Sequence, residues 1–135
     1  MKEENLFNII RFNDKGLVCT IAQDYKSNEV LMMAFMNKES IKLTLETGFV
    51  CYFSRSRNKL WKKGESSGQL QELQEMLIDC DGDAILLKVK QLGKPVGVAC
   101  HTGRKSCFFN KVGNNGKISI NQKVLIKEED LYGKK

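Results

Sequence analysis

The sequence has few of the features that mark membrane, secreted and multidomain proteins. Its 135 residues include a single proline, no low-complexity linker and no internal repeat, so we expect one domain spanning residues 1–135. The longest uninterrupted apolar run, Val30 to Met36, is far too short for a membrane-spanning helix. The first residues are polar and acidic, where a secretory signal needs a basic start followed by an apolar stretch. We therefore expect a cytoplasmic protein with no membrane association.

Histidine is equally scarce, with one residue, and the five cysteines are an odd number. An odd set of thiols without a secretory signal argues against a disulfide framework and leaves metal binding or thiolate chemistry open. Cys19 and Cys51 lie in apolar runs and are predicted to be small core residues. A Walker phosphate loop is also missing, because the glycine-containing segment 113–117 is too short and lacks a final Ser or Thr. The sequence gives no support for nucleoside-triphosphate hydrolysis.

Positive charge is in excess. There are 22 lysines and arginines against 16 acidic residues, for a net charge of +6 and a pI near 9.1. This balance favours a polyanionic partner but does not distinguish a nucleic acid from a phosphorylated metabolite. Arginines, lysines, serines and glycines gather in residues 54–68, which makes this segment a candidate phosphate-binding surface. The alternative is an exposed basic loop without a ligand.

Strand signals dominate the pattern of the chain. Apolar, β-branched and aromatic runs predict strands at residues 16–23, 29–36, 48–54 and 85–91. Residues 70–78 fit either a helix or a strand. A turn-rich segment between two short runs predicts a hairpin over residues 108–120, and the tail at 127–135 is expected to be solvated and frayed.

One helix stands out, over residues 37–48. Asn37 or Ser40 supplies a capping side chain, Ile41 and Leu45 lie four residues apart, and Gly48 is typical of a helix end.

The segment Asp79-Cys80-Asp81-Gly82-Asp83 is the most informative part of the sequence. Its alternating carboxylates can converge on one cation of the magnesium type if an extended backbone turns at Gly82. An EF-hand loop is excluded, because its sixth and twelfth positions would be Ala84 and Lys90. An acidic hairpin tip is the alternative for the carboxylates alone. Cys80 within the motif favours a metal site.

Two further thiols, Cys100 and Cys107, flank the only histidine, His101. Sulfur ligands suit zinc, so Cys80, Cys100 and Cys107 are predicted zinc ligands. Because His101 directly follows Cys100, it is poorly placed to complete a tetrahedral site. An open position therefore fits a catalytic zinc better, while a closed Cys3His structural site is the alternative. His101 itself is either a structural residue or a proton-transferring catalyst.

Taken together, these motifs resemble phosphoribosyl-AMP cyclohydrolase, a family of histidine biosynthesis. The similarity covers about residues 17 to 109. The matching stretches, in order, are AQDYKSNEVLMMAFMN, SRSR, WKKGESSG, DCDGD and ACHTGRKSCFF.

The resemblance implies a β-rich α+β fold, with a mixed sheet or pseudobarrel wrapped around one main helix, in an intertwined homodimer. It implies that residues 70–78 form a strand. It also implies zinc held by Cys80 of one subunit with Cys100 and Cys107 of the other, and magnesium held by Asp79, Asp81 and Asp83. Residues 110–135 would form the C-terminal hairpin and tail of a single cyclohydrolase domain.

The implied reaction is hydrolysis of the N1–C6 bond of the adenine ring of phosphoribosyl-AMP, with zinc activating water and His101 relaying a proton. The residues expected to bind the substrate and its phosphates are Arg55, Arg57, Lys62, Lys63, Gly64 and Ser66. A zinc-stabilised nucleic-acid-binding module is the rival hypothesis. It leaves the three aspartates unexplained, because carboxylates repel nucleic-acid phosphates unless a cation bridges them. We therefore expect no nucleic-acid partner.

Overall fold

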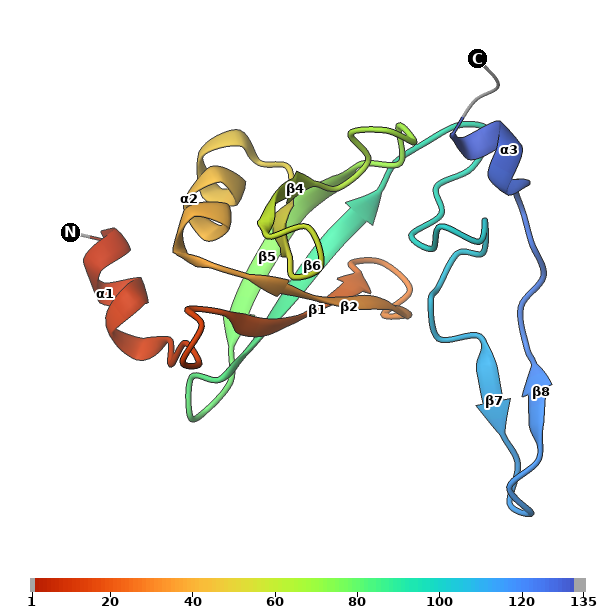
Figure 1. The fold of residues 1–135 in the computed structure, drawn as a ribbon, viewed down its shortest axis with the longest axis horizontal. Helices are drawn as coiled ribbons and strands as arrows, with labels where there is room; N and C mark the ends of the chain where they lie inside the picture. Colours follow the sequence, from red (N-terminus) through yellow and green to blue (C-terminus); the bar gives the residue numbers. More distant parts are fainter. Residues whose placement is uncertain (1, 133–135) are drawn as a thin grey trace.

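A six-stranded mixed sheet forms the body of the molecule in the computed structural model, which describes residues 2–132 (Figure 1). The elements in chain order are α1 (Lys2–Ile9), β1 (Val18–Asp24), β2 (Val30–Met36), α2 (Lys38–Thr47), β3 (Cys51–Ser54), β4 (Lys59–Lys62), β5 (Gln71–Ile78), β6 (Ala84–Gln91), β7 (Asn110–Val112), β8 (Ile118–Ile120) and α3 (Glu128–Leu131). The β-rich α+β class predicted from the sequence is confirmed.

The strand order is β4-β3-β2-β1-β6-β5, and only the β1–β6 pair is parallel. The sheet curls until its far edge meets the start of β3. There the Val50 amide donates to the Gln71 carbonyl at 2.9 Å and the Leu73 amide donates to the Gly48 carbonyl at 2.8 Å. These bonds join β5 to the segment before β3. The sheet is therefore curled into a half-barrel, in line with the predicted mixed sheet or pseudobarrel.

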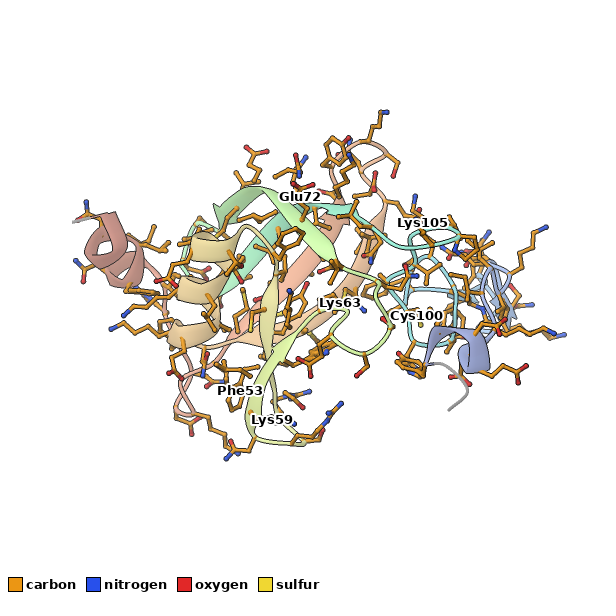
Figure 2. All side chains as sticks on the ribbon, turned by 90° about the horizontal axis from the view of Figure 1, so that it is seen from above. Phe53, Lys59, Lys63, Glu72, Cys100 and Lys105 are labelled. Carbon is orange, nitrogen blue, oxygen red and sulfur yellow. The ribbon has the colours of Figure 1, made fainter. Side chains whose placement is uncertain are left out.

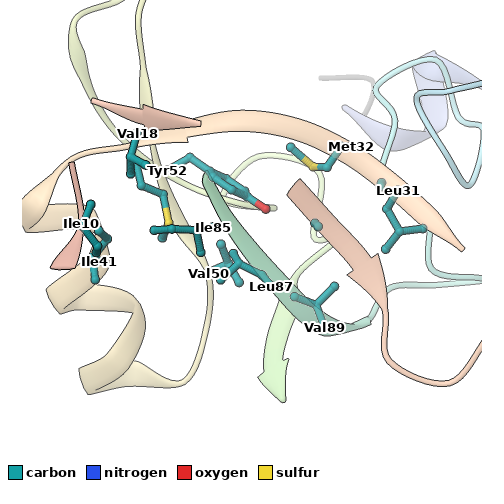
Figure 3. Close-up of a cluster of buried hydrophobic side chains, with 13 residues drawn as sticks. Ile10, Val18, Leu31, Met32, Ile41, Val50, Tyr52, Ile85, Leu87 and Val89 are labelled. Carbon is teal, nitrogen blue, oxygen red and sulfur yellow. The ribbon is translucent and has the colours of Figure 1, made fainter. Parts of the chain in front are cut away.

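The main helix, α2, starts and ends where the sequence predicts. Asn37 and Ser40 form a reciprocal capping box, and Gly48 ends the helix in a left-handed conformation with φ of 81°. The buried Ile41 of α2 packs into a core built from the sheet, with Val18, Leu87 and Tyr52 (Figure 3). This core fixes the strands whose ends carry the site residues.

The sequence of residues 70–78 fits either a helix or a strand, and the structure shows the strand β5. Pairing of Gln71–Ile78 with β6 supplies backbone hydrogen bonds and so decides between the two. The predicted hairpin at 108–120 is present as β7 and β8, which extend away from the body (Figure 1). Val112, Ile118 and Ile120 on this arm are about 60% exposed or more (63%, 64% and 60%). Within the described chain, no helix is both long and apolar enough to cross a membrane.

The prediction of a frayed tail is wrong for the residues that the structure describes. Glu128–Leu131 form the short helix α3, and Leu131 is only 6% exposed in a small cluster with Val98 and Ile126. The hydrophobic contact of one leucine orders a segment whose composition is mostly charged. Residues 133–135 of the predicted tail lie outside the described part of the chain.

Candidate active site

The acidic segment forms the turn between β5 and β6. The Asp79 amide donates to the Ala84 carbonyl at 3.0 Å, and the Ala84 amide donates to the Asp79 carboxylate at 3.2 Å. Gly82 has φ of 79°, and a side chain there would overlap the Ile9 carbonyl that packs against the turn. The sharp reversal that the sequence requires of Gly82 is therefore present.

The turn brings the carboxylates of Asp79, Asp81 and Asp83 together, with one oxygen of each within 4.8 Å of the others. Hydrogen bonding to Asp81 and Asp79, and their negative charge, raise the pKa of Asp83 above its ordinary value. Mutual repulsion of this kind is relieved by a cation. Three exposed hard oxygen donors fit a magnesium ion that keeps several of its waters.

Cys100 and Cys107 lie in a loop after β6 whose backbone is tied both to itself and to the sheet. The Cys100 amide donates to the Arg104 carbonyl at 3.2 Å, and the Cys107 amide donates to the Leu31 carbonyl of β2 at 2.7 Å. The two thiols lie close enough to interact, and the Cys100 sulfur also lies 3.0 Å from the Thr102 hydroxyl oxygen. Although Cys107 is an exposed residue, partial desolvation of its thiol and the adjacent Cys100 raise its pKa to about 12. Two adjoining sulfurs fit two positions of a tetrahedral zinc site.

The third predicted zinc ligand lies elsewhere. Cys80 is exposed on the β5–β6 turn, and β6 runs from that turn toward the Cys100 loop at the other side of the molecule (Figure 1). Eight residues of strand span roughly 23 Å at about 3.3 Å per step. Among residues 5–132, whose side chains the structure describes, the aspartate triad is the only group of three potential ligands whose atoms lie within 4.8 Å of one another. One chain does not bring its three thiols together.

A hollow of about 390 Å³ opens beside the Cys100 loop, and we call it the site hollow. It collects six residues that the sequence analysis singled out. They are Arg57, Lys63, Gly64, Ser66, His101 and Cys107. Arg55 and Lys62 are not among its lining residues.

Lys62 is the last residue of β4, and Lys63 is the first residue of the turn that follows. Lys62 is exposed with its ammonium 5.5 Å from the Phe49 ring, whereas Lys63 is 8% exposed and donates to the Ala99 carbonyl at 2.6 Å. Burial lowers the pKa of Lys63, against the opposing effect of the nearby Cys107 and Cys100 thiols. In Figure 2, Lys63 lies between Phe53 and Cys100. Through its hydrogen bond to the Ala99 carbonyl, Lys63 holds the backbone that leads into Cys100.

Gly64 directly follows Lys63 and has a structural reason to be glycine. Its φ is 89°, and a Cβ there would lie 2.6 Å from the Gln69 backbone. The turn that begins here places Ser66 at the rim of the site hollow.

The sequence analysis assigned no role to three residues of the site, which are Glu128, Tyr132 and Trp61. His101 is exposed, and its Nδ1 lies 3.4 Å from a carboxylate oxygen of Glu128 in α3. Tyr132, directly after α3, and Trp61 of β4 also line the site hollow. Nothing local in the sequence ties the C-terminal residues to His101, whereas Trp61, the only tryptophan, lies within the basic segment 54–68 and was a usable signal.

Comparison with known proteins gives a consistent result. The family model described as phosphoribosyl-AMP cyclohydrolase matches residues 32–109. A phosphoribosyl-AMP cyclohydrolase of Granulibacter bethesdensis is 57% identical over 96% of this chain and 98% of its own. One from Alcanivorax borkumensis is 58% identical over 93% of this chain and 84% of its own. One from Rhodospirillum rubrum is 56% identical over 95% and 87%.

Proposed function

The chain belongs to the phosphoribosyl-AMP cyclohydrolase family of histidine biosynthesis, and from that membership we propose that it opens the adenine ring of phosphoribosyl-AMP by metal-dependent hydrolysis. The observation that carries the proposal is the site hollow, where His101 and Cys107 face the same space as Arg57 and Lys63. A hydrolytic centre and cations for an anionic substrate thus share one hollow.

The substrate carries a ribose phosphate on each of N1 and N9 of adenine, and substitution at N1 makes C6 electrophilic. In the hydrolysis, a water oxygen bonds to C6, the N1–C6 bond breaks and a proton reaches N1. Zinc, when bound, supplies activation of the attacking water, as it does for adenine C6 in zinc deaminases.

His101 is the residue that we assign to proton transfer. Its Nδ1 faces the Glu128 carboxylate at 3.4 Å, which leaves Nε2 as the nitrogen that can exchange a proton with the reacting groups. Glu128 is then a positioning residue that orients the ring. The docking of α3 through Leu131 supports this arrangement, because it keeps Glu128 beside His101.

The separation of the thiols supports a homodimeric zinc site. Cys100 and Cys107 of one subunit would supply two sulfurs, and Cys80 of a second subunit would supply the third, leaving a position for water. The exposed apolar side chains of the β7–β8 arm are further support for association, since a two-stranded hairpin is marginally stable alone in water.

A zinc site shared between two subunits would also bring the three aspartates close to the zinc. Because Asp79 and Asp81 flank Cys80 in the chain, the subunit that lends Cys80 also brings its carboxylates to the zinc site. We assign Asp79, Asp81 and Asp83 to magnesium, which would orient substrate hydroxyls or a phosphate.

The test is turnover by the purified protein with zinc and magnesium, followed by the absorbance change of ring opening. We expect turnover that a chelator abolishes and zinc restores, and no salt-sensitive binding of random oligonucleotides in a parallel assay. The Cys107→Ser protein is the inactive control. Lack of turnover in protein with full zinc content, or tight salt-sensitive oligonucleotide binding in its place, would refute the proposal.

A further inference from the structure

A second hollow of about 610 Å³ adjoins the site hollow. Both are lined by Met33, Ala34 and Trp61, so the two hollows share one wall. The second hollow contains neither a thiol nor His101 among its lining residues. Because it lacks these groups, the second hollow suits a part of the substrate away from the reacting bond.

The second hollow has the charge of an anion site. Its lining includes two cations, Lys15 and Arg55, the hydroxyls of Ser54 and Ser56, and no carboxylate from the described chain. The site hollow also has two cations, Arg57 and Lys63, together with the carboxylate of Glu65. Two hollows with two cations each suit a ligand with two separated phosphates.

The cations of the second hollow come from segments that are far apart in sequence. The Arg55 guanidinium lies 4.2 Å from the centre of the Phe35 ring, which restricts its orientation and leaves its N–H edges available. Lys15 sits in a turn before β1 whose shape is set by Asn13, since the Asn13 side chain accepts from the Lys15 amide at 2.8 Å. Lys15 and Arg55 are both exposed and so can reach a phosphate from solvent.

Trp61 lies between the two hollows, and its packing against Tyr52 holds its ring in place. Its ring centre lies 5.5 Å from that of Tyr52, which is fully buried and donates its hydroxyl proton to Gln71 at 2.6 Å. A purine against Trp61 would have one hollow on each side.

Building on the proposed cyclohydrolase function, we propose that the second hollow binds the ribose 5-phosphate arm on N9, through Lys15 and Arg55. The reacting C6 must lie beside the thiols and His101 in the site hollow. N1 is bonded to C6, so the N1 arm stays on that side with Arg57 and Lys63. N9 lies across the purine from N1, so its arm extends past Trp61 into the second hollow.

The inference is tested with AMP, which carries only the N9 arm, against adenosine, which lacks the phosphate. Trp61 is the only tryptophan of the chain, so its fluorescence reports binding without any turnover. We expect wild-type protein to bind AMP about tenfold or more tightly than adenosine. Lys15→Met combined with Arg55→Gln should remove that preference, leave adenosine binding unchanged and raise KM for phosphoribosyl-AMP more than it lowers kcat.

Lys26→Met is the matched control, because Lys26 is an exposed lysine in another loop and does not line either hollow. It should keep the wild-type preference for AMP. An unchanged AMP preference in the double variant would overturn the inference, and so would wild-type protein that turns over phosphoribosyl-AMP but does not distinguish AMP from adenosine. Loss of the AMP preference in the double variant of a protein without turnover would support the phosphate site while the proposed reaction fails.

Discussion

At the scale of single residues, Lys62 and Lys63 show how two consecutive lysines, one at the end of β4 and one in the turn after it, differ in role. Both were predicted to bind substrate phosphate. Only Lys63 enters the site hollow, where its ammonium is already bound to the Ala99 carbonyl at 2.6 Å. Its cation therefore acts on the loop that carries Cys100 as well as on any ligand.

The predicted zinc ligands can be tested one cysteine at a time. We expect Cys80→Ser, Cys100→Ser and Cys107→Ser each to lower zinc content and to abolish turnover, because two thiolates are too few to hold the metal tightly. Elemental analysis of the purified variants measures this. Cys19→Ser is the control and should keep its zinc. A full complement of zinc in Cys80→Ser protein would show that Cys80 is not a ligand.

The aspartates should respond to a different metal. Asp81→Asn is expected to raise the magnesium concentration needed for half-maximal activity while the zinc content stays at the wild-type level, since hard carboxylates and soft thiolates sort the two ions. Titration of activity with magnesium, alongside zinc analysis, measures both effects. An unchanged magnesium titration would count against the assignment of the triad.

At the scale of elements, α3 shows how weakly a short helix depends on its own sequence. Four residues cannot sustain a helix in water, and Leu131 provides the contact that holds this one. We expect Leu131→Ala to release α3, with faster amide exchange over residues 128–131 and lower kcat, because Glu128 no longer orients His101. Buried Leu→Ala changes typically cost about 2–5 kcal/mol.

Leu125→Ala is the matched control for this change. Leu125 is 44% exposed against 6% for Leu131, so its truncation should alter neither the exchange rates nor kcat. Slow exchange over 128–131 in the Leu131→Ala protein would show that other contacts hold α3.

The elements also differ in how far the sequence determines them. Helix α2 was predictable because Asn37, Ser40 and Gly48 encode both of its ends locally. Strand β4 was missed because Lys59–Lys62 is short and half lysine, and its pairing with β3 decides its structure. Helix α1 was missed as well. The ambiguous β5 needed its partner β6 for the same reason as β4.

The same distinction between local sequence and contacts with distant residues applies to the candidate site. The aspartate triad was predictable because five consecutive residues build it, and the Cys100–Cys107 pair because eight residues do. The contact of Glu128 with His101 joins residues 27 apart, and the distance of Cys80 from the other thiols depends on the direction of β6. Neither follows from local sequence.

At the scale of the whole molecule, the proposed zinc site shared between two subunits predicts complementation between two inactive proteins. Cys80→Ser protein and Cys107→Ser protein are mixed, allowed to exchange subunits in mild denaturant and refolded with zinc. In a heterodimer, one of the two sites regains all three thiols. At equal mixing about half of the dimers are heterodimers, so activity should recover to roughly a quarter of wild type at most.

Each variant alone, treated identically, is the control and should stay inactive. Background activity in a mixture with verified subunit exchange would mean that each site is built within one chain.

The length of β6 has a consequence for how the enzyme behaves on dilution. If a strand of eight residues keeps Cys80 away from Cys100 in every single chain, a working site exists only in associated protein. Specific activity should then fall as the enzyme concentration drops below the dissociation constant of the dimer. If zinc binds the pair and not the separate chains, as proposed, it would lower that constant by mass action. The metal supply of the cell would thereby set how much of this protein is assembled.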